Sequence, residues 1–161
     1  MTSEFDDPRL NDIHRYWLAK YRNGRLPRRA DIKPGELGSD VRHVNLIDVL
    51  HAPLRFRHRL VGSAIIEWVG RDATGRMIDE SLYGPATEET IASLARVVAT
   101  RRAFRRLERL DWNNQKWLMM ESVELPLAGN DGRIEMILRG AVFRPGNEPL
   151  GERLQFAPVD G

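Results

Sequence analysis

Residues 54–61 read Leu-Arg-Phe-Arg-His-Arg-Leu-Val, and Gly62-Ser63 follows. Arginine occupies every second position and apolar residues or His58 occupy the others, which predicts a half-buried strand. Just before it, residues 44–50 read Val-Asn-Leu-Ile-Asp-Val-Leu and predict a second strand. The break between them, residues 51–53, is short and contains proline, so the two strands should form a hairpin.

Helices and further strands flank this hairpin. Asp7-Pro8 supplies an N-cap and a first-turn proline, and apolar residues then recur at helical spacing as far as position 21. Short helical segments, a longer helix over 86–102 and three strand patterns up to residue 143 follow the hairpin. This order predicts an α+β fold in which helices pack on one face of a five-stranded antiparallel sheet.

The length and composition indicate one domain without cysteine chemistry. The chain has 161 residues and no cysteine, which excludes disulfides, thiolate nucleophiles and cysteine zinc sites. Because no apolar run reaches about 18 residues, we expect no membrane span. The acidic N-terminus lacks the apolar core of a signal peptide, so we expect a cytoplasmic protein.

The charge is nearly balanced although the isoelectric point is about 9.3. Net charge is +2, and 22 of the 25 basic residues are arginine. Few groups titrate between pH 7 and 9, so a high isoelectric point is compatible with a small net charge. The densest run, Arg101–Arg109, could contact nucleic acid, but we favour a solvated helix end followed by a charged strand.

No motif for catalysis or metal binding is present. Residues 70–75 have the glycine spacing of a phosphate-binding loop but lack the Lys and Ser/Thr that should follow. None of the four histidines has a metal-ligand spacing, and no serine lies in a nucleophile-elbow motif. We therefore expect neither catalytic residues nor a metal site.

Several short motifs occur in a fixed order over about residues 14–143. They are Tyr16-Trp17, Gly24-Arg-Leu-Pro27 with Arg29, Asp31-Ile32 and Pro34, Phe56–Ile65, Gly70–Arg76, and Leu125-Pro-Leu127. This ordered set resembles a bacterial family of short, stand-alone PAS-domain proteins. One departure is Gly62-Ser63, where the family usually has Gly-Thr.

The resemblance implies a PAS fold with strand order 2-1-5-4-3 and ligands between the sheet and the helices. We expect a flanking helix and connecting segment over 1–40, the PAS domain over 41–145 and a C-terminal tail over 146–161. A filled core remains the alternative to an open pocket. The candidate pocket residues are Phe56, His58, Ile65, Trp68, Val69, Leu94, Val98, Trp117 and Met119.

The residues also narrow the cofactors that the resemblance allows. Without cysteine, the photoactive flavin adduct and the thioester chromophore have no attachment point. Haem-binding PAS domains usually place their proximal histidine in the long helix, and residues 86–102 contain no histidine. Haem and cysteine-linked flavin are thus disfavoured, and the cofactor is unknown. A sensor of organic acids would need cationic groups, for which Arg59 or His58 would have to point inward.

We therefore expect a non-enzymatic sensory or regulatory module. Since the length leaves no room for an output domain, it should act through signalling proteins, possible small-molecule ligands and a homodimer. The alternatives are a small α+β enzyme or carrier acting on an apolar molecule in the same pocket, and a nucleic-acid binder, which we disfavour. The N-terminal helix should supply the dimer or partner interface through Leu10, Ile13, Trp17 and Tyr21.

Overall fold

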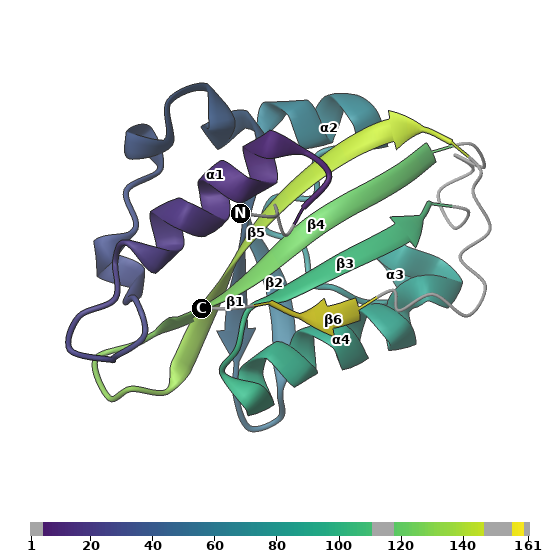
Figure 1. The fold of residues 1–161 in the computed structure, drawn as a ribbon. Coiled ribbons are helices and arrows are strands. Elements are labelled where there is room, and N and C mark those ends of the chain that lie inside the picture. Colours follow the sequence, from purple (N-terminus) through teal and green to yellow (C-terminus); the bar gives the residue numbers. More distant parts are fainter. Residues whose placement is uncertain (1–4, 111–117, 147–155, 160–161) are drawn as a thin grey trace.

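The computed structural model describes residues 5–110, 118–146 and 156–159. Its elements follow the predicted order of helix, hairpin, short helices, long helix and strands (Figure 1). In chain order they are α1 (Pro8–Leu18), the 3-10 helices η1 (Arg29–Asp31) and η2 (Pro34–His43), β1 (Val44–Leu50), β2 (Arg55–Val61), α2 (Ser63–Val69), α3 (Glu80–Tyr83), the 3-10 helix η3 (Gly84–Ala86), α4 (Thr87–Thr100), β3 (Phe104–Arg109), β4 (Leu118–Ala128), β5 (Ile134–Pro145) and β6 (Phe156–Pro158).

The sheet is antiparallel and has the order β2-β1-β5-β4-β3-β6. This confirms the α+β fold and the expected order of the first five strands. The sixth strand is a correction: residues 156–158 belong to the segment that the sequence analysis assigned to a tail, and they pair with residues 104–106 at the edge of β3. That pairing gives the edge strand a partner for its backbone groups.

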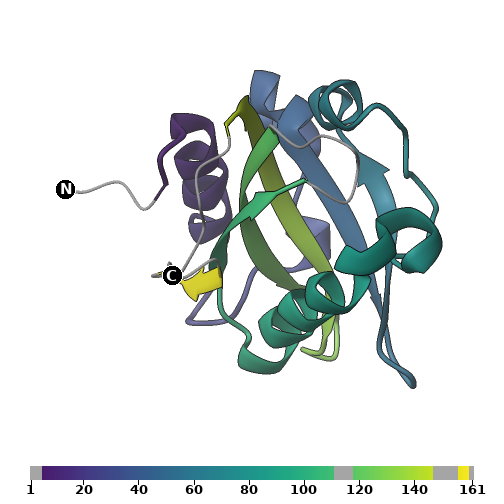
Figure 2. The ribbon, with the colours of Figure 1, turned by 90° about the vertical axis from the view of Figure 1, so that its right-hand side faces the viewer.

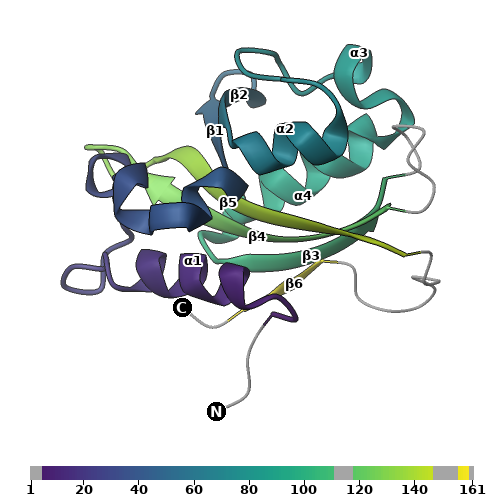
Figure 3. The same ribbon diagram turned by 90° about the horizontal axis from the view of Figure 1, so that it is seen from above.

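Both faces of the sheet are covered. All 11 residues of β4 are buried, whereas a strand with one solvated face would alternate. Helix α1 lies across one face, and α2, α3 and α4 lie across the other (Figures 2 and 3). We call the face under α1 the outer face and the face under α2, α3 and α4 the inner face. The expectation of helices on one face therefore holds for α2 to α4, while the flanking helix covers the opposite face.

Helix α1 is short but packs closely on the outer face. Asp7 caps it by accepting a hydrogen bond from the Arg9 amide. Leu10, Ile13 and Trp17 follow at helical spacing and are fully buried against β4 and β5. The Trp17 indole N–H donates to the backbone oxygen of Pro126 over 3.0 Å, which satisfies its one polar atom.

The inner face carries two apolar clusters. One joins α4 to β1 and β2 through residues such as Leu94, Ile47 and Phe56. The other joins α2 to the far ends of β4 and β5 through residues such as Ile65 and Met120. Helix α4 has 14 residues, whereas α2 has seven and α3 has four. The short helices therefore cover their part of the sheet less completely.

Gly140 allows the close approach of α1. A Cβ at this position would lie 2.8 Å from Ile13 Cδ1 and 3.1 Å from Leu10 Cδ2. We expect Gly140→Val to lower the free energy of unfolding in urea by about 1–3 kcal/mol, since overpacking displaces the helix. Gly35→Ala is the control, because nothing lies within 4 Å of a Cβ there. Equal stability of the two variants would contradict this account.

Candidate functional site

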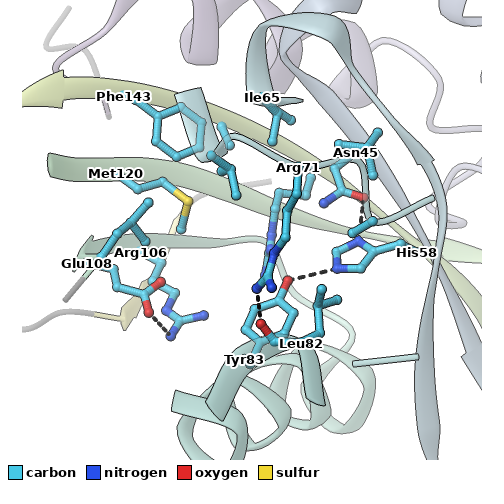
Figure 4. Close-up of a pocket in the computed structure, with 16 residues that line it drawn as sticks. Asn45, His58, Ile65, Arg71, Leu82, Tyr83, Arg106, Glu108, Met120 and Phe143 are labelled. Atoms are coloured by element: carbon cyan, nitrogen blue, oxygen red, sulfur yellow. Dashed lines mark hydrogen bonds and ion pairs between the residues drawn. The ribbon is translucent and has the colours of Figure 1, made fainter. Parts of the chain in front are cut away.

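A cavity of about 50 Å³ lies between the inner face of the sheet and the α2–α3 region. A single water needs roughly 10–15 Å³ by this kind of measure, so the space exceeds an ordinary packing defect. Figure 4 shows its labelled side chains converging from strands, helices and the connection after α2. The residues that line it are Asn45, His58, Val61, Ile65, Val69, Arg71, Ala73, Leu82, Tyr83, Arg106, Glu108, Leu110, Met120, Arg139, Ala141 and Phe143.

One end of the cavity is apolar. Ile65 of α2 packs here with Met120 and Phe143, and the neighbouring Leu110 and Ala141 belong to the same cluster. These side chains come from α2, β4, β5 and the end of β3, so the apolar end is built by parts far apart in the sequence. It offers hydrophobic contact to a ligand and no strong directional contact.

The floor of the cavity carries a buried polar row across three strands. Arg139 of β5 pairs in register with Glu124 of β4 on one side and with Asn45 of β1 on the other. Arg139 Nε donates to Glu124 Oε2 over 2.9 Å, and their side chains are 5% and 0% exposed. Burial lowers the pKa of Arg139, but the Glu124 carboxylate outweighs it and the pKa ends above its ordinary value. Arg139 therefore stays charged.

His58 connects this row to α3. Its Nδ1 lies 3.1 Å from Asn45 Oδ1, and its Nε2 lies 2.8 Å from the Tyr83 hydroxyl. Burial, with help from the nearby Arg139 charge, lowers the His58 pKa to about 3, so the ring is neutral. The Asn45 oxygen can only accept, so Nδ1 donates to it and Nε2 accepts from Tyr83. Both ring nitrogens are therefore used.

Two further arginines face the cavity. Arg106 of β3 is 3% exposed, and its Nη2 lies 3.3 Å from Glu108 Oε1. Arg71 enters from the connection after α2 and donates to the backbone oxygen of Leu82. In Figure 4, Arg106 and Glu108 lie across the cavity from His58, with Arg71 reaching between them. The polar end is therefore rich in guanidinium groups.

The structure brings only part of the predicted pocket together. His58, Ile65 and Val69 line the cavity. Trp117 lies outside the described residues. The exposed face of α2 carries Trp68, which is 39% exposed and stacks on Phe143.

The other predicted pocket residues have different places. Phe56, Leu94 and Val98 belong to the apolar cluster under α4, where the core is filled. Met119 is buried on the outer face and its neighbour Met120 lines the cavity instead, because side chains alternate along a strand. The predicted alternation of β4 holds, but Met119 lies on the face opposite the cavity.

The predicted interface residues of α1 lie mostly inside the chain. Leu10, Ile13 and Trp17 each have no exposed surface, and Tyr21 is partly buried beside them. The apolar stripe is thus covered by the chain's own sheet. A second chain could reach these three side chains only if α1 left that sheet.

The arginine run at residues 101–109 is split by the alternation of β3. Arg105 points to the outer face, where its Nε lies 2.6 Å from Glu121 Oε2, while Arg106 points into the cavity. Arg59 also faces outward, 3.8 Å from Asp48. The interpretation of the run as a solvated surface is therefore wrong for Arg106, which is buried.

Sequence reasoning missed most of the polar end, although two signals were present. Arg139 interrupts a long apolar run, and a lone charge in a buried strand needs a partner such as Glu124 of the neighbouring strand pattern. Arg106 and Glu108 share one face of β3 by their even spacing. Asn45 and Tyr83 had no signal, since their roles depend on the position of His58.

An antiparallel sheet with short helices, enclosing a cavity that is apolar at one end and cationic at the other, is the architecture of a small α+β module with an internal pocket. The family model described as a PAS domain matches residues 5–141, so the chain belongs to the PAS domain family. This is a family of sensory and regulatory modules. Neither the curated proteins nor the solved structures provide a match.

Membrane spans and metal sites are two further features to consider in the described part of the chain. Within residues 5–110, 118–146 and 156–159, no helix is both long and apolar enough to cross a membrane. The same residues contain no group of three or more His, Asp or Glu side chains placed to hold a metal ion.

The ion pair on the cavity floor should be costly to break. We expect Glu124→Leu to lower the free energy of unfolding by about 3–5 kcal/mol, since Arg139 would keep a buried charge without its carboxylate. The double variant Glu124→Leu, Arg139→Met should recover most of this loss in urea denaturation. Glu135→Leu, at an exposed position of β5, is the control. A double variant no more stable than Glu124→Leu would refute the coupling.

The neutral state of His58 should appear as a pH dependence. Because its folded pKa is about 3 against 6.5 in an ordinary histidine, only the unfolded state takes up a proton below pH 6.5. Stability should therefore fall as the pH drops from 7 to 5, by about 2 kcal/mol more in the native protein than in His58→Gln. Long-range ¹H–¹⁵N NMR should show a neutral imidazole at pH 5. A titration midpoint near 6.5 in the folded protein would contradict the assignment.

Proposed function

We propose that this PAS-domain protein is a non-enzymatic regulatory module that binds a small molecule in the cavity and passes the signal on by contact with other proteins. The observation that carries the proposal is the cavity itself, with an apolar end and a polar end. This combination suits a small ligand, because apolar contact supplies affinity and a few polar groups fix orientation.

The position of the cavity supports signalling through a ligand-dependent change in conformation. The cavity is bounded by α2, α3 and the connection that carries Arg71 and Ala73, so a bound molecule would contact elements near the surface. A ligand that binds one arrangement of these elements more tightly than another would shift the populations of the two arrangements.

The proposal also includes a cytoplasmic location in a bacterium, docking to signalling proteins and a homodimer. Light scattering would measure the mass of the homodimer.

A small enzyme or carrier in the same cavity is the other candidate. The neutral His58 and Tyr83 form a buried hydrogen-bonded pair, which is the observation that favours catalysis. Both groups, however, already use their hydrogen bonds within the wall, so we favour binding without turnover. The chemical state of a recovered ligand separates the two.

Native mass spectrometry of the purified protein tests the proposal. We expect a bound small molecule, released unchanged on denaturation, and we expect its occupancy to fall at least tenfold in Ala141→Leu. That substitution places a larger side chain in the cavity wall. Ala73→Leu, on the more exposed connection, is a second filling variant in case the first unfolds.

The control is Ala95→Leu, on α4 and away from the cavity. Equal occupancy in the native protein and both filling variants would place the ligand elsewhere. Progressive conversion of the bound molecule would favour the enzyme.

A further inference from the structure

Two buried arginines have donors that the wall of the cavity does not use. Arg106 and Arg139 are 3% and 4% exposed. Among the residues that the structure describes, Nη1 of Arg106 and Nη2 of Arg139 find no hydrogen-bond partner, and Nη2 of Arg106 has only the ion pair with Glu108 Oε1 at 3.3 Å. Buried polar groups are nearly always hydrogen-bonded, and unused donors on a charged group are especially costly. These atoms therefore call for an acceptor inside the cavity.

The charges of the wall favour an anion as that acceptor. Three guanidinium groups line the cavity, and Glu108 is the acidic residue among its described lining residues. Glu124 accepts a hydrogen bond from Nε of Arg139, and Nη2 of the same guanidinium, which lines the cavity, has no hydrogen-bond partner among the described residues. Guanidinium groups bind carboxylates through two parallel hydrogen bonds, a geometry that a lone water does not reproduce.

The neighbouring polar groups do not favour a cation or a strong donor. His58 is neutral, donates through Nδ1 to Asn45 and accepts through Nε2 from Tyr83, so it offers no free acceptor. Tyr83 is buried, and burial raises the pKa of its hydroxyl, so it stays protonated. Because His58 and Tyr83 are neutral, the arginine charges determine whether the cavity favours an anionic or a cationic ligand.

The other end sets the rest of the ligand. Ile65, Met120 and Phe143 form an apolar surface a short way along the cavity from the guanidinium groups. A bare inorganic anion would leave this surface without contact. A molecule with an acidic head and an apolar body would use both ends at once.

We propose that the cavity binds a small organic acid, with its carboxylate on Arg106 and Arg139 and its apolar body against Ile65, Met120 and Phe143. This inference rests on the proposed function, because it names the chemical class of the ligand for the same cavity. Arg71, on the connection between α2 and α3, contributes further positive charge to the cavity wall.

A matched series of probes tests the charge. Propionate, butyrate and benzoate would be titrated into the protein beside propionamide, butyramide and benzamide, with inorganic phosphate as a further arm. Binding would be followed by NMR of the arginine Nε–H groups and the Met120 methyl group. We expect each acid to bind at least about tenfold more tightly than its amide, as hydrogen bonds between charged groups allow.

Variants of β3 give the matched control. Arg106→Gln should weaken binding of the acids about tenfold or more and change binding of the amides less than about twofold. Arg106→Lys, which keeps the charge but loses the planar fork, should fall between them. Arg105→Gln alters the adjacent arginine on the outer face and should leave all affinities unchanged.

Several results would overturn the inference. Amides that bind as tightly as acids, phosphate that binds as tightly as benzoate, or unchanged acid affinity in a folded Arg106→Gln variant would each do so. A neutral co-purified molecule displaced by the filling variants would overturn the acidic ligand while supporting the proposed function. A cavity that takes up no probe and holds no co-purified molecule would overturn both.

Discussion

The structure depends on covering both faces of one sheet. The 11 consecutive buried residues of β4 can be stable only if apolar cover lies on each side. Helix α1 supplies the outer cover, and its close approach depends on the missing side chain of Gly140. The helix that resembled a free interface is therefore part of the core. A partner that engaged its buried stripe would have to compete with the chain's own sheet for Leu10, Ile13 and Trp17.

The inner face is covered unevenly, and the cavity follows from that. Helix α4 fills its half with apolar side chains, including Leu94 and Val97, which are fully buried. The other half is covered by α2 and α3, which are too short to fill the space above the polar row of Asn45, Arg139 and Glu124. The same half receives Arg71 from the connection. Core and site thus share one sheet but have separate covers.

The sequence predicted the fold further than the site. Alternation placed His58 on the face of its strand opposite the arginines, and the element order predicted the sheet, because both depend on local periodicity. The predicted pocket mixed two regions: Phe56 and Leu94 belong to the filled core, whereas Ile65 and Val69 line the cavity. Apolar residues look alike in sequence whether they fill a core or line a space. The polar end depends on register, which puts Arg139 opposite Glu124 although 15 positions separate them.

The buried charges are the part of the site that stability does not explain. Replacing a buried ion pair by apolar residues of similar size is often neutral or stabilising, so such a pair contributes little to stability itself. Here there are two buried ion pairs, Arg139–Glu124 and Arg106–Glu108. Both lie beside an apolar cluster, and apolar residues in their place could have extended that cluster across the floor of the cavity. Glu124 keeps the Arg139 guanidinium charged and in place, and Glu108 pairs with Arg106. Nη1 of Arg106 and Nη2 of Arg139 remain without a hydrogen-bond partner among the described residues. A fixed set of donors facing a cavity costs stability and gains selectivity for what enters it. This selectivity is what the proposed binding of an acidic ligand requires, and the apolar cover on both faces supplies the stability that the buried charges cost.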